Sequence, residues 1–300
     1  MKSILFLLPS QTQFQFLYLL GFSWLFQYLL LWGLKLGIDF TGGTTFTYTV
    51  NRGININQIQ SYLTSQYSQS TIIKENVNTY QVEVPPLSQS QLSKLQRDIY
   101  QKFNLGKAQS ITTIGPTIGS QLRNDAIYSI IIVMIGIILY IAWAFREVPK
   151  PANSLIFGSS AILAMIHDTV IVLGAFAILG HFLGAPVDTL FITAVLTVIG
   201  FSVHDTIVVF DRIRENLLKK EVSDFANTVN NSLMQTLNRS LNTSFTVLLV
   251  LVALFMLGGI TIRWFAVALL IGIFSGTYSS IFVASQLLVI YYEYKDRNRK

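Results

Sequence analysis

Long apolar stretches alternate with short polar connections along most of the chain. A helix needs roughly 20 apolar residues to cross the ~30 Å hydrocarbon core of a bilayer. Six stretches reach or approach this length, near residues 14–36, 126–145, 153–179, 187–210, 240–259 and 264–290. The first is longer than the apolar core of a signal peptide, and no small-residue cleavage pattern follows it. The pattern therefore predicts an α-helical integral membrane protein with six transmembrane helices.

The region between the first two stretches, residues 37–125, is polar and changes its periodicity several times. "TTFTYTV" alternates like a strand, and the apolar residues from Ile56 to Tyr67 repeat at helical spacing. Two strand-like runs then flank Asn78, and a capping box at Ser88 precedes a second helical pattern and a last strand. The order β-α-β-β-α-β predicts a small α+β domain of the ferredoxin-like kind.

The distribution of basic residues predicts the orientation of the chain. Lys and Arg follow the second and fourth stretches and fill the C-terminal "KDRNRK", whereas "GHFLGAPVD" after the third stretch has neither. Loops rich in Lys and Arg remain in the cytoplasm. We therefore expect a cytoplasmic N-terminus with the first helix, an extracytoplasmic domain, five further helices including a cytoplasmic amphipathic segment, and a basic cytoplasmic tail. Their respective bounds are 1–36, 37–125, 126–290 with the segment at 211–236, and 291–300.

Composition supports the membrane assignment and excludes several classes of function. The mean hydropathy is +0.52 and 12% of residues are charged, against about a quarter in soluble domains. The chain has no cysteine, which excludes disulfides, thiolate metal sites and cysteine nucleophiles. The net charge of +6 comes largely from residues beside apolar runs, so we expect no nucleic-acid binding. We also expect no cofactor.

The triplet His-Asp-Thr occurs twice inside apolar stretches, at 167–169 and 204–206. A charge at the centre of a span costs on the order of 2.5–3.5 kcal/mol, so each aspartate needs a partner. Arg239 lies at a depth comparable to that of Asp205, and Thr243 stands one helical turn further on. We therefore predict an Asp205–Arg239 ion pair that switches proton uptake at the carboxyl group; a static pair that fixes the helices is the alternative.

The first copy of the triplet allows two interpretations. Asp168 lies nearer mid-membrane than Asp205, and no Lys or Arg in the other stretches matches its depth. It is either a secondary relay position, together with His167 and His204, or a neutral carboxyl group bonded across helices. We expect no metal at the two histidines, because no third ligand is positioned. Gly272 and its i+4 neighbour Gly276 predict close helix packing.

Four ordered stretches carry a resemblance to a known family: "LGIDFTGGT" (36–44), "IGPTIGSQL" (114–122), "GFSVHDTIVVFDRIREN" (200–216) and "TLNRSLNTS" (236–244). With the six-span layout, they resemble SecF, the smaller membrane subunit family of the SecD–SecF complex of bacterial protein export, within the resistance–nodulation–division superfamily. The resemblance places the family's ion-coupling aspartate, arginine and hydroxyl on Asp205, Arg239 and Thr243. Its motif before the outer domain falls on Asp39, Phe40, Thr41, Gly42 and Gly43.

The resemblance implies a non-enzymatic subunit that couples ion flow down the membrane potential, carried by protons, to late steps of preprotein translocation. The implied partners are a SecD-like subunit, the SecY-E-G channel, the translocating preprotein and the lipid bilayer. The implied location is the bacterial plasma (inner) membrane, with the thylakoid membrane as an alternative. Two other functions stay open: half of a superfamily transporter for lipids or small molecules, which the small outer domain disfavours, and a passive membrane scaffold.

Overall fold

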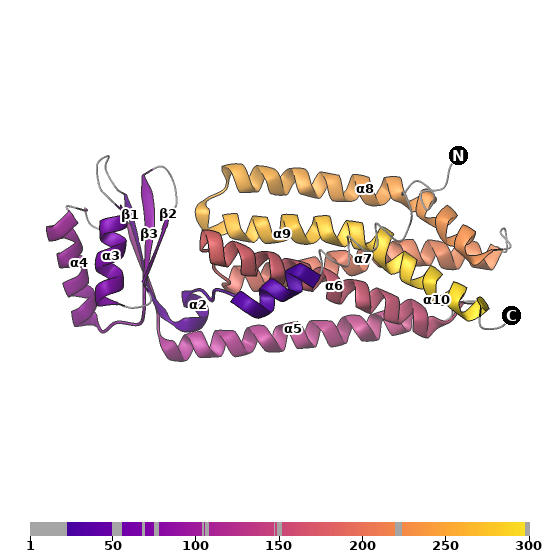
Figure 1. The fold of residues 1–300 in the computed structure, drawn as a ribbon, viewed down its shortest axis with the longest axis horizontal. Coiled ribbons are helices and arrows are strands. Elements are labelled where there is room, and N and C mark those ends of the chain that lie inside the picture. Colours follow the sequence, from indigo (N-terminus) through magenta and orange to yellow (C-terminus); the bar gives the residue numbers. More distant parts are fainter. Residues whose placement is uncertain are drawn as a thin grey trace. The chain divides into compact units, whose positions relative to one another are not determined.

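The computed structural model describes residues 23–49, 56–67, 70–74, 78–103, 105, 108–146, 148, 152–219 and 224–297. It divides into two compact units. The smaller unit comprises Lys35–Ser129 and Leu183–Thr189, and the larger unit comprises the chain up to Leu34, Ile130–Phe182 and Leu190–Lys300. Figure 1 shows the small unit as a sheet with two helices, and the large unit as a set of long helices.

The small unit is built on a four-stranded antiparallel sheet. Its strands are β1 (Gly43–Thr49), β2 (Thr71–Lys74), β3 (Thr79–Val84) and β4 (Ser110–Ile114), in the order β2-β3-β1-β4. Helix α3 (Ile56–Gln66) follows β1 and α4 (Gln89–Phe103) follows β3, on the same face of the sheet (Figure 1). The observed element order, β-α-β-β-α-β, is the one that the periodicity predicts.

Apolar side chains of one sheet face and of the two helices form the core of the small unit. Phe46 and Val82 of the sheet pack with Leu63 of α3 and Leu95 of α4, all of them at most 2% exposed. The capping box at the start of α4 is present, since the Ser88 amide donates to the side chain of Gln91 at 2.9 Å. The alternating strand pattern and the helical spacing thus bury the residues expected from the sequence.

The large unit contains five helical stretches long and apolar enough to cross a membrane. Four are α5 (Pro116–Ala144), α6 (Ser154–Leu183), α7 (Thr189–Lys219) and α8 (Phe225–Leu257). The last runs through α9 (Ile260–Ser279), a π-helical turn η2 (Ser280–Ala284) and α10 (Ser285–Arg297). The last five predicted spans are thereby found. The first predicted span, 14–36, lies partly outside the described residues. Within its described part, residues 23–32 are helical.

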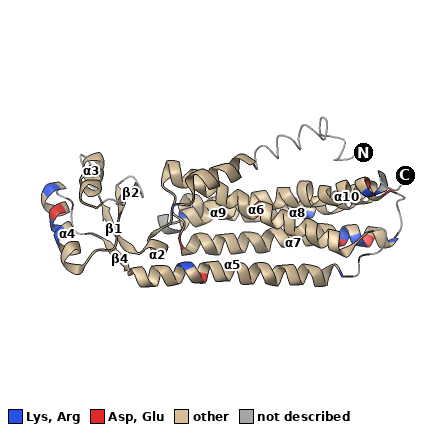
Figure 2. Cartoon of the chain, turned by 60° about the horizontal axis from the view of Figure 1, so that its bottom comes forward, with Lys and Arg blue, Asp and Glu red and all other residues tan. Residues whose placement is uncertain are grey.

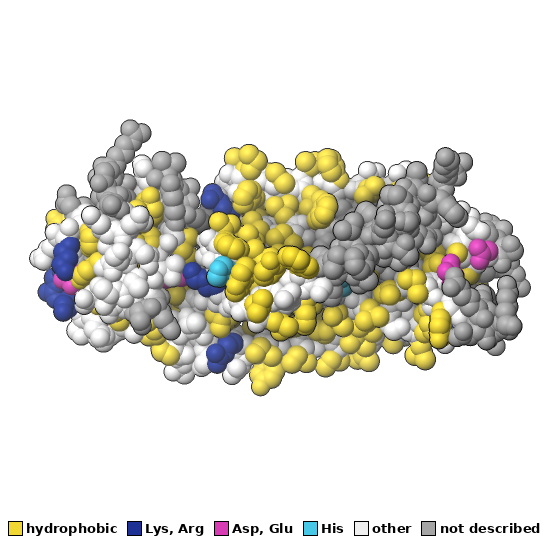
Figure 3. All heavy atoms as spheres, viewed as in Figure 1, with side chains coloured by type: hydrophobic (Ala, Val, Ile, Leu, Met, Phe, Trp, Pro, Cys, Tyr) yellow, Lys and Arg dark blue, Asp and Glu magenta, His cyan; other side chains and the backbone are white. Residues whose placement is uncertain are grey.

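Burial separates the interior helices from the peripheral ones. Only 6% of the most apolar window of α5 is buried, against 50% for α7 and 61% for the last span. Hydrophobic side chains cover much of the helices on the face that Figure 3 shows, and the long helices are free of Lys, Arg, Asp and Glu over most of their described length (Figure 2). Polar groups between α6, α7 and α9 therefore lie in the protein interior, away from the lipid-facing surface.

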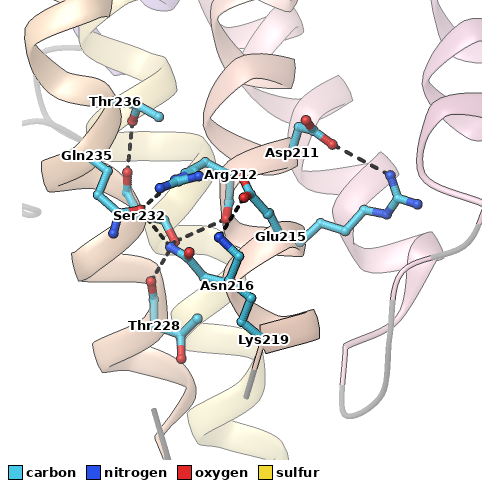
Figure 4. Close-up of polar contacts among 10 residues, drawn as sticks. Asp211, Arg212, Glu215, Asn216, Lys219, Thr228, Ser232, Gln235 and Thr236 are labelled. Carbon is cyan, nitrogen blue, oxygen red and sulfur yellow. Dashed lines mark hydrogen bonds and ion pairs between the residues drawn. The ribbon is translucent and has the colours of Figure 1, made fainter. Parts of the chain in front are cut away.

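The predicted amphipathic surface segment, 211–236, is not a separate element. It consists of the end of α7 and the beginning of α8, which continue as helices on either side of residues 220–223. Of its apolar residues, Ile213 and Val229 are fully buried, whereas Leu218 is exposed. Polar contacts brace the pair, since Asn216 Nδ2 donates to Ser232 Oγ at 2.8 Å (Figure 4). The segment is therefore divided between two long helices, and its place at the cytoplasmic membrane surface stays a prediction.

Candidate functional site

The two copies of the His-Asp-Thr triplet lie on the buried faces of α6 and α7. Asp168 is fully buried and Asp205 is 7% exposed. The histidines before them differ: His167 is buried with its Nδ1 3.0 Å from Asp168 Oδ1, whereas His204 is exposed. Successive helical residues point about 100° apart, so burying Asp205 turns His204 outward. The two copies therefore have different surroundings despite their identical sequence.

Asp168 contacts polar groups on three helices. Ser202 of α7 and Ser279 of α9 each place a hydroxyl 2.5 Å from its Oδ2. Ser275 of α9 donates to Oδ1 at 3.0 Å, and His167 contacts the same oxygen. A carboxyl group has two oxygens with about four hydrogen-bonding positions, and the three hydroxyls and the imidazole nitrogen together occupy them. We call Ser202, Ser275, Ser279 and His167 the donor cage of Asp168.

Two glycines bring α9 close enough to α7 to form this cage. A Cβ atom on Gly276 would lie 3.1 Å from Ser202 Cβ, and one on Gly272 would lie 2.1 Å from Val198 Cγ2. Small residues let helix backbones approach each other within a membrane. The spacing of these glycines predicts close packing, and the structure shows its consequence, which is that the serines of α9 reach a carboxylate on α6.

Asp205 is bonded far less completely. Ser240 of α8 donates to its Oδ1 at 2.6 Å. Its Oδ2 is buried and has no hydrogen-bond partner among the residues that the structure describes. A buried polar atom without a partner costs roughly 1–3 kcal/mol, and more when the group is charged. Of the two buried aspartates, Asp205 is thus the one whose carboxyl group has a vacant position for a proton or a cation.

The two threonines of the triplets also differ in their contacts. Thr169 donates to Met165 O of its own helix at 2.9 Å. Thr206 lies 3.0 Å from the hydroxyl of Ser280, which begins the π-helical turn η2 of the last span. π-Turns are rare and frequently mark functional sites. The second copy of the triplet therefore contacts an irregular part of the last span.

The predicted Asp205–Arg239 ion pair is not formed. Arg239 and Thr243 both lie on the exposed face of α8, and Arg239 makes no hydrogen bond or ion pair with any described residue. The next residue along α8, Ser240, points at Asp205 instead. The depth of Arg239 along its helix was compatible with the pair, but its direction around the helix is not, because adjacent residues differ by about 100°.

Sequence reasoning missed the hydroxyl groups that surround both carboxylates. A single serine in the sequence does not indicate a functional site, because serines are common in irregular segments. Ser275 and Ser279, however, repeat at i,i+4 within one apolar span. Such spacing places both on one helix face. Serines repeated on one face of a span, four residues apart, would have indicated a polar partner on a neighbouring helix.

The motif before the outer domain forms a short helix and a sharp turn. Helix α2 (Ile38–Thr41) carries Asp39, whose Oδ2 accepts hydrogen bonds from Thr189 N at 3.0 Å and Thr189 Oγ1 at 2.6 Å. Thr189 is the first residue of α7, so the carboxylate accepts from a backbone amide at the positive end of that helix. Gly42 has φ +73°, and a Cβ on Gly43 would lie 2.6 Å from Val84 O. Both positions require glycine.

Near this motif the small unit holds one carboxyl group with an altered proton affinity. Burial raises the pKa of Glu83 on β3 above its ordinary value of 4.5. The ammonium group of Lys35 acts in the opposite direction, while the carboxylates of Asp188 and Asp39 reinforce the increase. Glu83 therefore binds a proton more readily in the folded unit than in an unfolded chain.

Comparisons with known proteins agree with the resemblance found in the sequence. The profile described as "Protein export membrane protein SecD/SecF, C-terminal" matches residues 94–294, and that of the SecD/SecF GG motif matches residues 33–54. A "Protein translocase subunit SecF" from Thermobaculum terrenum is 45% identical over 282 residues, which cover 90% of this chain and 88% of that protein. The SecF of Synechocystis is 37% identical, and the match covers 84% of this chain and 81% of that protein.

Solved structures of longer relatives have the same fold. The crystal structure of SecDF from Thermus thermophilus, titled a translocon-associated membrane protein, superposes with a TM-score of 0.80 at 34% identity. The match covers 92% of this chain but only 37% of the SecDF chain, so this protein spans little more than a third of that relative. With its described spans, its GG motif and its match along most of the SecF relatives, the chain belongs to the SecF family of SecD/SecF protein export membrane proteins.

Proposed function

We propose that this chain is the SecF-type subunit of the Sec protein export machinery and that it couples proton movement down the membrane potential to late steps of preprotein translocation. The observation that carries the ion-coupling role is the carboxyl group of Asp205, buried in a span with one oxygen unpartnered among the described residues. Ionisable groups inside spans usually mark ion pathways. Ser240 can bond this carboxyl group in either protonation state, since a hydroxyl both donates and accepts.

Arg239 and Thr243, which lie on the exposed face of α8, also take part in the proposed ion coupling. A guanidinium exposed on a membrane helix is costly unless a protein partner or the interface receives it. The related SecDF protein joins a SecF-like part to the remainder of a longer chain. We therefore infer that the face carrying Arg239 and Thr243 docks a SecD-like subunit. In that complex, rotation or sliding of α8 would bring the arginine and Asp205 together.

The remaining parts of the proposal concern the surroundings of the protein. The small, ferredoxin-like unit lies outside the cytoplasm and moves in response to ion flow, close to preprotein that emerges from the SecY-E-G channel. Both chain ends lie in the cytoplasm, and the membrane is the bacterial plasma membrane. Arg146 after α5 and Arg212, Arg214 and Lys219 at the end of α7 lie where the cytoplasmic side is expected, which supports this orientation.

The test replaces Asp205 by asparagine, which keeps nearly the same volume and can still accept from Ser240 but cannot carry a proton. We expect Asp205→Asn to leave the yield of the complex with its SecD-like partner unchanged, while potential-driven export and ion conductance fall to the level of a strain lacking the protein. Asp211→Asn, the same change at an exposed carboxylate six residues further along α7, is the matched control. Normal export by a normal amount of Asp205→Asn complex would refute the role of Asp205.

A further inference from the structure

A groove with a volume of 380 Å³ lies between the end of α5 and α7, outside the site formed by the two His-Asp-Thr triplets. Aromatic and apolar side chains line it together with charged ones. The lining residues that decide its chemistry are Tyr140, Trp143 and Arg146 at and just after the end of α5, and Ile207, Asp211 and Arg214 of α7. The groove therefore brings two guanidinium groups together beside aromatic rings.

A cluster of phenylalanines holds the two walls of the groove together. Phe145, which is 2% exposed, has its ring centroid 5.8 Å from that of Phe157 on α6 and 5.7 Å from that of Phe210 on α7. The three groove residues of α7 follow one another at i, i+4 and i+7, so they lie on one face of that helix. The end of α5 is thus packed against α7 beside the face that lines the groove.

The two arginines make the groove positively charged. Arg146 Cζ lies 5.1 Å from the ring centroid of Trp143, in a cation–π contact that uses no hydrogen-bond acceptor. Arg214 Nη1 lies 3.6 Å from Asp211 Oδ1, and the side chains of this pair are 30% and 68% exposed. An ion pair that is this long and this exposed is weak. The carboxylate of Asp211 therefore offsets only part of the positive charge of the two guanidinium groups.

The rest of the lining suits a lipid rather than an anion in solution. A guanidinium binds a phosphate through paired N–H···O hydrogen bonds. Tyr140 and Trp143 are 50% and 61% exposed, and the neighbouring Leu139 is 65% exposed, on a helix whose most apolar window is only 6% buried. Tyr and Trp on spanning helices are enriched at the membrane–water interface. The wall of the groove on α5 thus continues into a surface suited to acyl chains.

In the proposed orientation, these ends of α5 and α7 lie at the cytoplasmic side of the membrane. Basic pockets between spanning helices on that side bind anionic lipid headgroups. We propose that the groove binds one anionic phospholipid, whose phosphate contacts Arg146 and Arg214 while its acyl chains lie along the exposed apolar surface of α5. The bound lipid joins α5, the least buried of the five described spans, to α7. This site does not depend on proton coupling at Asp205.

The experiment counts the lipids bound to the purified full-length chain by native mass spectrometry. The chain is titrated with phosphatidylglycerol, and phosphatidylcholine with the same acyl chains is the zwitterionic comparison. Arg146→Gln and Arg214→Gln each remove one guanidinium group from the groove. Lys219→Gln is the matched control, because it removes a positive charge near the same end of α7 from a side chain that does not line the groove.

We expect the wild type to bind its first phosphatidylglycerol about tenfold more tightly than phosphatidylcholine. Arg146→Gln should weaken the binding of phosphatidylglycerol about fivefold. Arg214→Gln should weaken it less, because Asp211 already offsets part of that charge. Binding of phosphatidylcholine by these variants, and of both lipids by Lys219→Gln, should match the wild type.

Three results would overturn the proposal. Unchanged affinity for phosphatidylglycerol in Arg146→Gln would show that the groove does not hold the headgroup. An equal loss in Lys219→Gln would show a general effect of surface charge. Displacement of the lipid by millimolar inorganic phosphate would show a site for a free anion. Arg146 is exposed and lies beyond the last helical residue of α5, so Arg146→Gln decides the question even if Arg214→Gln does not accumulate.

Discussion

The packing of α9 against α7 makes a strong prediction at Gly272. An added Cβ there would lie 2.1 and 2.6 Å from the two methyl groups of Val198 and 2.9 Å from its Cβ. Carbon atoms in contact stay about 3.5–4.0 Å apart. Val198 is only 1% exposed, so its side chain is enclosed by the protein. Gly272→Ala should therefore force the two helices apart, or force Val198 out of its preferred rotamer.

The expected cost follows from the size of the overlap. Overpacking a close-packed site by one methyl group typically destabilises a protein by about 1–3 kcal/mol. Val198→Ala alone leaves a cavity and should cost about 2 kcal/mol. In the double variant, Gly272→Ala with Val198→Ala, the added Cβ enters the space that the valine methyl groups leave. Its free energy of unfolding should therefore exceed the value expected from the sum of the two single changes by about 1–3 kcal/mol.

The assay is reversible unfolding of the purified chain in mixed micelles, which gives the free energy of unfolding of each variant. Gly136→Ala on α5 is the matched control, because nothing lies within 4 Å of an added Cβ there. That change should be neutral or should stabilise α5 by up to about 1 kcal/mol, as alanine is the better helix former. Additive effects of the Gly272 and Val198 changes would refute the argument, since they would show that the two side chains do not meet.

Three further predictions concern the small unit and the topology. Because burial raises the pKa of Glu83, its protonation stabilises the folded unit below pH 4.5, and this stabilisation is lost as the pH rises through the raised pKa. Glu83→Gln should therefore be more stable than the wild type in thermal unfolding at neutral pH, and its stability should depend less on pH. Equal pH dependence in both would count against this. Asp39→Ala should raise the hydrogen-exchange rate of the Thr189 amide by about tenfold, with Asp39→Asn intermediate, and unchanged exchange would show that the contact is not maintained. A label at Asn76 should react from outside the cell and one after Lys300 from the cytoplasm; reaction of both from one side would exclude the proposed orientation.

The sequence predicted the positions of helices and strands far better than the directions in which individual side chains point. Apolar length identifies five described spans, and alternation with helical spacing identifies the strands and helices of the small unit, because these patterns reflect burial directly. It did not reveal that Ser240 rather than Arg239 faces Asp205. A span that is apolar on all sides carries little information about which face points inward, and a difference of one residue rotates a side chain by about 100°. The donor cage was missed for the same reason, since its members come from three helices.

The π-turn at Ser280–Ala284 has a consequence for how the last span tolerates changes in length. A single π-turn holds one residue more than the α-helical turn it replaces, and the hydroxyl of Ser285 donates to the carbonyl of Ser280 across it at 3.0 Å. Deleting one residue within the turn would restore a regular helical turn and leave the helix beyond it in nearly the same rotational phase. Tyr292, whose ring centroid lies 4.2 Å from that of Phe225, would then keep this neighbour. A deletion in the regular helix between the turn and Tyr292 would instead rotate everything beyond it by about 100°. The last span can thus lose one residue at the π-turn without losing its contact with α8.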